Sequence, residues 1–213
     1  MSIVKEIAAA VEAGKSKQVG GLVEQALAEG VEATVILNEG MIKAMGVVGE
    51  KFKNNEIFVP EMLIAARAMK KGVEIIAPYL AKQGVEPIGT IILGTVAGDL
   101  HDIGKNLVGM MIEGAGFKVL DLGVDVPPEK FIEVMKATPN CKVVALSALL
   151  TSTMPAITST IKAIEESGLR GTVKIMVGGA PVTQAFADEI GADGYSEDAA
   201  SAAQLAKKLY GIA

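Results

Sequence analysis

A chain of 213 residues is long enough to bury the core of one or two domains. Half of its residues are apolar, but only 4% are aromatic and none is Trp, so the interior must be built from aliphatic side chains and Met. The 20 Lys and Arg residues against 25 Asp and Glu leave a net charge of −5, which argues against DNA or RNA as a partner.

Secretion and membrane insertion are not expected from the sequence. The single Cys141 cannot form an intrachain disulfide, which favours a reducing compartment. The N-terminal segment mixes Lys5, Glu6 and Glu12 with its apolar residues and so lacks the continuous apolar stretch of a signal peptide. The uncharged segment from Val143 to Ile161 contains many Ser and Thr residues, which predict a buried strand, a turn and a helix rather than a membrane span. We therefore expect a cytoplasmic protein without a membrane partner.

Helical patterns alone occupy the chain before Gly84. The segments from Ile3 to Glu12 and from Lys17 to Ala28 are predicted to be short helices separated by Gly14. Apolar residues then recur every three or four positions in two further segments, first at Leu37, Met41, Met45 and Val48, and then, from Pro60 to an end near Pro78, at Met62, Ala65, Ala66, Met69, Val73 and Ile76. Four antiparallel helices are the simplest assembly of these segments.

Strands and helices alternate after Gly84. The apolar runs GTIILGTV, FKVLDLG, KVVALS and VKIMVGG each precede a helical pattern, and Gly194-Tyr195 marks a short fifth strand. Runs that are apolar throughout are typical of strands buried on both faces, so we predict an α/β fold with a doubly wound, Rossmann-like parallel sheet. The linker from Gln83 to Pro87 would separate a helical domain of residues 1–86 from an α/β domain of residues 87–213.

The loop after the first predicted strand contains the only histidine of the chain, His101. Ligands of doubly wound sheets bind at the carboxyl ends of the strands, where this loop lies. Asp99 can accept a hydrogen bond from one ring nitrogen of His101 and leave the other nitrogen for a metal. Asp102 is a candidate N-cap of the following helix. The pair Gly104-Lys105 lacks the spacing of a phosphate-binding loop, because Asp99 occupies the place of that loop's first glycine.

Three motifs resemble those of cobalamin-binding domains. They are Asp-x-His-x-x-Gly at Asp99, His101 and Gly104, Ser-x-Leu at Ser147 and Leu149, and Gly-Gly at Gly178 and Gly179. They follow the first, third and fourth predicted strands, at the edge of the sheet where the fold binds ligands. The resemblance implies cobalamin or a related corrinoid as the cofactor.

The resemblance also implies a role for each site residue. His101 would be the lower axial ligand of cobalt, with Asp99 and the Thr153 hydroxyl as the further members of a hydrogen-bonded chain. The nucleotide tail of the cofactor would insert between the strand ends. The implied cofactor-binding residues of this domain are Gly98, Asp99, His101, Asp102, Ile103, Gly104, Ser147, Leu149, Thr151, Gly178 and Gly179.

The helical half resembles a narrower group. The segments MGVVGEKF and EIFVPEM are similar to the four-helix cap that precedes the cobalamin domain in methionine synthase and in the corrinoid proteins of methyl transfer from methanol, methylamines and methoxylated aromatics. In that group the cap places apolar side chains over the methyl group on cobalt, and the matching positions here are Phe52 and Val59. An ordinary core role for both residues is equally compatible with the sequence.

The resemblance implies a corrinoid carrier protein that accepts a methyl group on cobalt from a substrate-specific methyltransferase. It would pass this group to a second methyltransferase that acts on a thiol or folate-type acceptor, and a reductive activation protein would be a further partner. The chain alone would turn over no substrate. Two alternatives are the small subunit of an adenosylcobalamin-dependent isomerase, against which the cap argues, and a cobalamin-based sensor, for which the chain offers no room for a DNA-binding segment. The methyl donor is not indicated.

Overall fold

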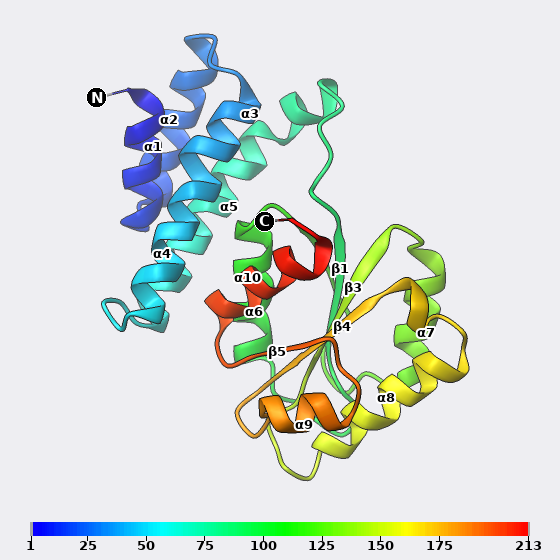
Figure 1. Cartoon of the computed structure of the whole chain (residues 1–213). Coiled ribbons are helices and arrows are strands. Elements are labelled where there is room, and N and C mark those ends of the chain that lie inside the picture. The colour runs from blue at the N-terminus through cyan, green and yellow to red at the C-terminus, as the bar shows by residue number, and fades with distance from the viewer. Residues whose placement is uncertain (1, 213) are drawn as a thin grey trace. The chain divides into compact units, whose positions relative to one another are not determined.

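The computed structural model describes residues 2–212 and divides into two compact units (Figure 1). One unit contains the chain up to Pro87 together with Gly114–Gly116, and the other contains Ile88–Glu113 and the chain from Phe117 onward. The first unit consists mainly of α1 (Ile3–Glu12), α2 (Ser16–Ala28), α3 (Ala33–Val35), η1 (Ile36–Ile42), α4 (Lys43–Lys53) and α5 (Val59–Lys82). Its interior is aliphatic and Met-rich, as the composition predicts.

The third predicted helix contains a π-helical segment that the apolar periodicity did not indicate. This segment, η1, lies between α3 and α4 without a break in the helical backbone. A π-helical turn is wider than an α-helical one and rotates the residues that follow it. Ile36 and Met41 are consequently buried, whereas Leu37, predicted as a core residue, is only half-buried.

Helix α5 continues past Pro78, where the sequence predicted its end. Proline removes one backbone donor, and Pro78 lies at an exposed position close to the end of a long helix, so the loss is local. The helix ends instead before Gly84, which has a φ of +66°. The Val85 N–H donates to the Leu80 carbonyl at 3.0 Å, as in a Schellman cap.

The second unit is built around a parallel sheet. Its strands are β1 (Thr90–Thr95), β2 (Lys118–Asp121), β3 (Cys141–Ser147), β4 (Lys174–Gly178) and β5 (Gly194–Ser196). They lie in the order β2-β1-β3-β4-β5, and every neighbouring pair is parallel. The helical segments are α6 (Ile103–Gly114), α7 (Pro128–Ala137), α8 (Met154–Glu166), η2 (Arg170–Thr172), α9 (Gln184–Glu189) and α10 (Ala199–Tyr210). The predicted doubly wound α/β fold is confirmed.

Helices cover both faces of this sheet (Figure 1). Residues of α7, α8 and the α9 region form one core cluster with Ile92, Val144 and Ile175. Helix α6 covers the opposite face, because a Cβ at Gly109 would lie 3.2 Å from Leu93, whose side chain points away from that of Ile92. Strand β1 is buried along its whole length as predicted, whereas β2, at the edge of the sheet, is only partly covered.

The strand order switches direction at the carboxyl ends of β1 and β3, which is where doubly wound sheets bind their ligands. The chain leaves β1 for α6 on one face and leaves β3 for α8 on the other, so the two loops diverge at this point. The strand register pairs Thr95 with Ser147 and Ser147 with Gly178. The three sequence motifs therefore meet at one edge of the sheet.

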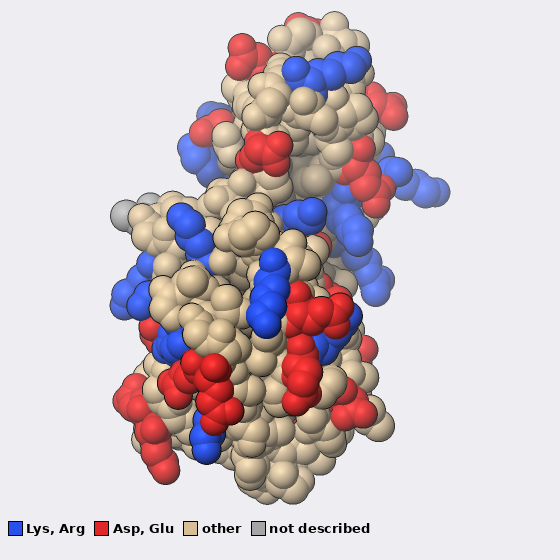
Figure 2. Space-filling model, turned by 90° about the vertical axis from the view of Figure 1, so that its right-hand side faces the viewer, with Lys and Arg blue, Asp and Glu red and all other residues tan. Residues whose placement is uncertain are grey.

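Opposite charges are interspersed on the surface. Figure 2 shows Lys and Arg side chains among Asp and Glu side chains on the face drawn. This mixture differs from the basic stripe of proteins that neutralise a nucleic-acid backbone. Within residues 2–212, no helix has both the length and the apolar composition needed to cross a bilayer.

Candidate functional site

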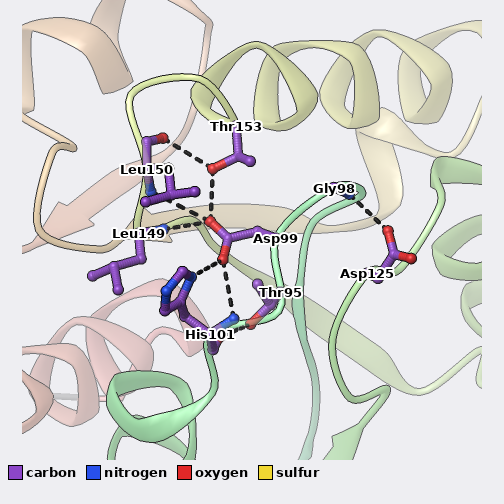
Figure 3. A network of polar contacts seen from close by, with 8 residues as sticks. All are labelled: Thr95, Gly98, Asp99, His101, Asp125, Leu149, Leu150 and Thr153. Carbon is purple, nitrogen blue, oxygen red and sulfur yellow. Dashed lines mark hydrogen bonds and ion pairs between the residues drawn. The ribbon is translucent and has the colours of Figure 1, made fainter.

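His101 lies in the loop that connects β1 to α6 (Figure 3). Its ring nitrogen Nδ1 is 2.7 Å from Oδ1 of Asp99, and the same oxygen accepts the backbone N–H of His101 at 3.1 Å. The Asp99 side chain is fully buried, whereas 49% of the His101 side chain is exposed. One ring nitrogen is therefore held by a buried carboxylate, and Nε2 is the nitrogen left for a ligand.

The second oxygen of Asp99 joins the loops that follow β1 and β3. Oδ2 accepts the Leu149 N–H at 2.7 Å and the hydroxyl of the buried Thr153 at 2.6 Å. The Leu150 N–H points at the same oxygen over 3.4 Å, and the Leu150 carbonyl lies 2.9 Å from the Thr153 hydroxyl. The carboxylate thus connects the imidazole of His101 to the hydroxyl of Thr153 and to the backbone of the β3–α8 loop (Figure 3).

The surroundings of Asp99 favour its charged form. Burial by itself would raise the pKa of this carboxyl group, but the hydrogen bonds from Thr153, Leu149 and His101 outweigh burial and hold the pKa of Asp99 well below its ordinary value. A charged carboxylate beside Nδ1 keeps the proton of a neutral imidazole on Nδ1. The lone pair of the ring then lies on Nε2, which is the form that binds a metal.

Two residues that the sequence reasoning missed also hold this loop. The Thr95 hydroxyl donates to the His101 carbonyl at 2.9 Å, and Oδ1 of Asp125 accepts the Gly98 N–H at 2.7 Å. Thr95 is the last residue of β1 and is fully buried, whereas Asp125 belongs to the loop after β2. For Thr95, the sequence offered one signal, which is a polar residue at the end of a mostly apolar strand. Asp125 had none, because strand pairing alone brings it here.

The packing of the chain itself requires a glycine at position 179 and leaves little space for a side chain at Gly178. Gly179 has a φ of +125°, and a Cβ there would lie 1.8 Å from the Ala148 carbonyl oxygen. A Cβ at Gly178 would lie 3.2 Å from the Ser196 carbonyl oxygen. The backbone after β4 therefore passes directly against the β3–α8 loop, beside the half-buried Ser147. The structure brings the second and third motifs together.

The outer side of the His101 loop is apolar. Leu100 is 72% exposed and Ile103 is 79% exposed, and Leu149 and Leu150 are exposed on the loop after β3. A Cβ at Gly104 would meet no atom within 4 Å. Exposed apolar side chains near a half-exposed imidazole are typical of a ligand-binding surface. Leu100 and Leu150 were not predicted, because a leucine carries no sequence signal of exposure.

The other residues of this region that the sequence analysis considered lie outside the polar network around Asp99. The Asp102 carbonyl accepts the Asn106 N–H at 2.7 Å, and its carboxylate accepts the side-chain amide of Asn106 at 2.9 Å. Lys105 is turned inward, where it pairs with Asp121 at the end of β2 and with Oδ1 of Asn106 at 2.7 Å. Its ammonium group is therefore engaged by side chains of the protein itself. Thr151 lies exposed in the turn before α8.

Phe52 and Val59 belong to the helical unit. Phe52 is half-buried near the end of α4, and Val59 is exposed as the first residue of α5. Their neighbour Phe58, which the sequence reasoning passed over, is 63% exposed. None of the three takes part in the polar network around Asp99, and the expected role of Phe52 and Val59 over a cofactor stays a prediction.

Comparison with family models identifies the kind of domain that carries this site. A model described as a B12 binding domain matches residues 89–204, and a second model of the same description matches residues 3–77. The chain belongs to the B12-binding family. The match of the first model includes all three motifs and the whole network around Asp99.

Other B12-binding proteins resemble the chain over nearly its whole length. The dimethylamine corrinoid protein 3 of Methanosarcina acetivorans is 43% identical over 207 residues, which cover 97% of this chain and 96% of that protein. A solved cobalamin-binding protein from Desulfitobacterium hafniense has a TM-score of 0.81 and 30% identity, covering 97% of this chain and 98% of that one. A chain of the methanol:cobalamin methyltransferase complex from Methanosarcina barkeri has a TM-score of 0.83 and 28% identity, covering 98% of this chain and 80% of that one. The predicted corrinoid cofactor and the fold of a helical cap followed by a Rossmann-like domain are confirmed.

The residues of this B12-binding site fit a corrinoid. A corrin ring supplies the equatorial ligands of its own cobalt, so the protein has to supply only an axial donor. Nε2 of His101 is such a donor, and the exposed side chains of Leu100 and Ile103 flank it with apolar surface. The absence of a side chain at Gly104 leaves room beside the imidazole loop.

Proposed function

We propose that the protein is a corrinoid carrier that accepts a methyl group from a substrate-specific methyltransferase and passes it to a second methyltransferase acting on a thiol or folate-type acceptor. The observation that carries the proposal is the His101 imidazole, which a buried carboxylate holds by Nδ1 so that Nε2 faces away from the protein network. When bound, the corrinoid supplies a cobalt centre that accepts and releases the methyl group. The chain supplies binding and orientation and has no turnover of its own.

In this proposal His101 is the metal ligand, and Asp99 and Thr153 set its orientation and tautomer. The hydroxyl of Ser147 and the side-chain-free backbone at Gly178 and Gly179 line the place where the nucleotide tail would insert. Thr151, Gly98 and Asp102 would border the same region, and the exposed apolar side chains of Leu149 and Ile103 would pack against the bound corrinoid and reduce the access of water to the imidazole. Phe52 and Val59, from the helical unit, would shield the upper face.

The partners are proposed from the relatives. One relative is named a dimethylamine corrinoid protein, and one structural neighbour is part of a methanol:cobalamin methyltransferase complex. These names support a methyltransferase that acts on methanol or a methylamine as the first partner. The second methyltransferase and a reductive activation protein follow from the chemistry, because the methyl group needs an acceptor and an oxidised cobalt needs an electron donor.

The axial ligand is tested by loading the apo-protein with hydroxocobalamin under anaerobic conditions and removing free cofactor by desalting. We expect the wild-type protein to retain the corrinoid and to show the visible spectrum of a histidine-ligated form. His101→Ala should show the spectrum of a form without histidine ligation, because no other imidazole exists in the chain. A colourless wild-type protein after desalting, or identical spectra for the two proteins, would contradict the proposal.

The carrier role is tested separately with the loaded, reduced protein. Methyl transfer to the bound corrinoid is measured with a panel of methyltransferases and their donors, namely methanol and mono-, di- and trimethylamine. We expect one donor and enzyme pair to methylate the protein at least about tenfold faster than the others. Preference for an adenosyl upper ligand, with no methylation by any pair, would favour the small subunit of an adenosylcobalamin-dependent isomerase instead.

A further inference from the structure

Asp125 has an uncommon backbone conformation beside the His101 loop. It is one of two non-glycine residues with a positive φ in residues 2–212, with a value of +52°, and the other is Asn55 at +59°. The left-handed region costs a side-chain-bearing residue free energy, although Asp and Asn tolerate it better than most residues. Asp125 is also exposed, so burial of its side chain does not offset this cost.

Asp125 makes two hydrogen bonds to the residues that precede His101, and Figure 3 shows the one to Gly98. Its Oδ1 accepts the Gly98 N–H at 2.7 Å, and its backbone N–H donates to the Asp99 carbonyl at 2.9 Å. Gly98 itself has a φ of +80°. The carboxylate and the backbone of one residue thus hold two consecutive residues of the loop, including the residue whose carboxylate orients the imidazole.

The sheet holds Asp125 in place on both sides. Gly123 accepts the Thr95 N–H at 3.0 Å, and the Val126 N–H donates to the Thr95 carbonyl at 3.0 Å. A parallel bridge between Val96 and Val126 extends this pairing. The loop after β2 is therefore an extension of the β1–β2 ladder, and it presents Asp125 to Gly98 from a rigid support.

We propose that Asp125 is a positioning residue that holds the loop from Gly98 to His101 in the shape that brings Nε2 of His101 to the axial position of a bound corrinoid. This inference rests on the proposed function. Without the carboxylate, the Gly98 N–H loses its acceptor, and the backbone at Gly98, which directly precedes Asp99, is held less firmly. The carboxylate of Asp99 then holds the imidazole in a wider range of orientations, and fewer of them suit ligation.

The test compares Asp125→Gly with Asp125→Asn. Glycine adopts a positive φ without strain but removes the acceptor, whereas asparagine tolerates the same φ and keeps a side-chain oxygen at this position. Each variant is loaded with cobalamin, and the ratio of histidine-ligated to unligated cofactor is measured from the visible spectrum and from the nitrogen splitting in the electron paramagnetic resonance spectrum of the Co(II) form. We expect Asp125→Gly to lower this ratio about tenfold and Asp125→Asn to stay within about twofold of wild type.

Asn55→Gly is the matched control, because it makes the same kind of replacement at the other positive-φ residue. It should leave the ratio unchanged. Asp125→Ser also removes the carboxylate and is measured in parallel, in case Asp125→Gly does not fold. Circular dichroism checks the fold of each variant.

A purely structural role for Asp125 would lower the unfolding midpoint without changing the ligation ratio, and that result would overturn the inference. An equal loss of ligation in Asn55→Gly would also overturn it. A wild-type protein that shows no histidine ligation is a different outcome, because it contradicts the proposed function before any variant is compared.

Discussion

Two glycines of the site occupy their positions for different physical reasons. Gly104 and Gly179 both match motif positions, and the resemblance implies that both contact the cofactor. In the structure, a Cβ at Gly104 would meet no atom within 4 Å, whereas one at Gly179 would meet the Ala148 carbonyl oxygen at 1.8 Å. Gly179 is therefore needed for folding, and a need for Gly104 would have to come from a ligand.

Alanine substitution separates these two requirements. Gly179→Ala should lower the free energy of unfolding of the apo-protein by about 3 kcal/mol, because the backbone must shift and a positive φ becomes strained. Gly104→Ala should change it by no more than about 1 kcal/mol but should weaken corrinoid binding about tenfold. Urea denaturation and cofactor titration measure the two effects. Equal affinity of Gly104→Ala and wild type would remove Gly104 from the proposed binding site.

At the scale of elements, Asp193 joins the beginning of β4 to the chain that enters β5. Its carboxylate accepts the Ile175 N–H at 2.8 Å and pairs with Lys174 at 2.9 Å and with Arg170 at 2.8 Å. Burial by itself would raise the pKa of Asp193, but the Ile175 N–H and the two cations outweigh burial and lower it. This carboxylate lies at the end of the sheet opposite to the His101 loop, so it reports on the fold alone.

The lowered pKa predicts a pH-dependent contribution to stability. The charged form of Asp193 stabilises the fold above the unfolded-state pKa of about 4, and this contribution is lost as the pH falls through the lower folded-state value. Asp193→Asn should therefore reduce the free energy of unfolding by about 1 to 2 kcal/mol at pH 7 and by progressively less below pH 4. Urea denaturation at a series of pH values measures this. The same difference at pH 7 and pH 3 would show that the charge is not involved.

On the scale of the whole molecule, the chain divides into two compact units. Residues 83–89 lie outside helices and strands, and most of them are exposed. Exposed connections with few contacts are where proteases cut folded proteins first. We propose that this segment links two domains that fold separately.

Limited proteolysis tests this division. Trypsin should cut first after Lys82, the exposed last residue of α5, and yield two resistant fragments of residues 1–82 and 83–213. Mass spectrometry of a time course identifies them. The variant Lys82→Gln should delay this cleavage. An earlier cut inside β1–α6 or α2 would show that the proposed domains are not the stable units.

The sequence by itself was sufficient for the type and approximate position of most elements. Apolar residues that recur every three or four positions indicate the buried face of a helix, and short continuous apolar runs indicate buried strands. The helices and the parallel strands were therefore predicted within a few residues. The sequence was also sufficient for the pair Asp99 and His101, because a loop after a strand can fold an imidazole onto a carboxylate two residues earlier in the chain.

Tertiary structure decided how distant residues complete the site, because local patterns did not indicate Asp125 and only the family resemblance implied Thr153. Thr153 and Asp125 reach the His101 loop because β1 lies between β3 and β2, and strand order depends on pairings between segments far apart in the chain. The π-helical segment and the continuation of α5 past Pro78 were likewise not indicated by the local apolar pattern. Local patterns report which face of an element is buried, whereas only the assembled sheet determines what that element meets.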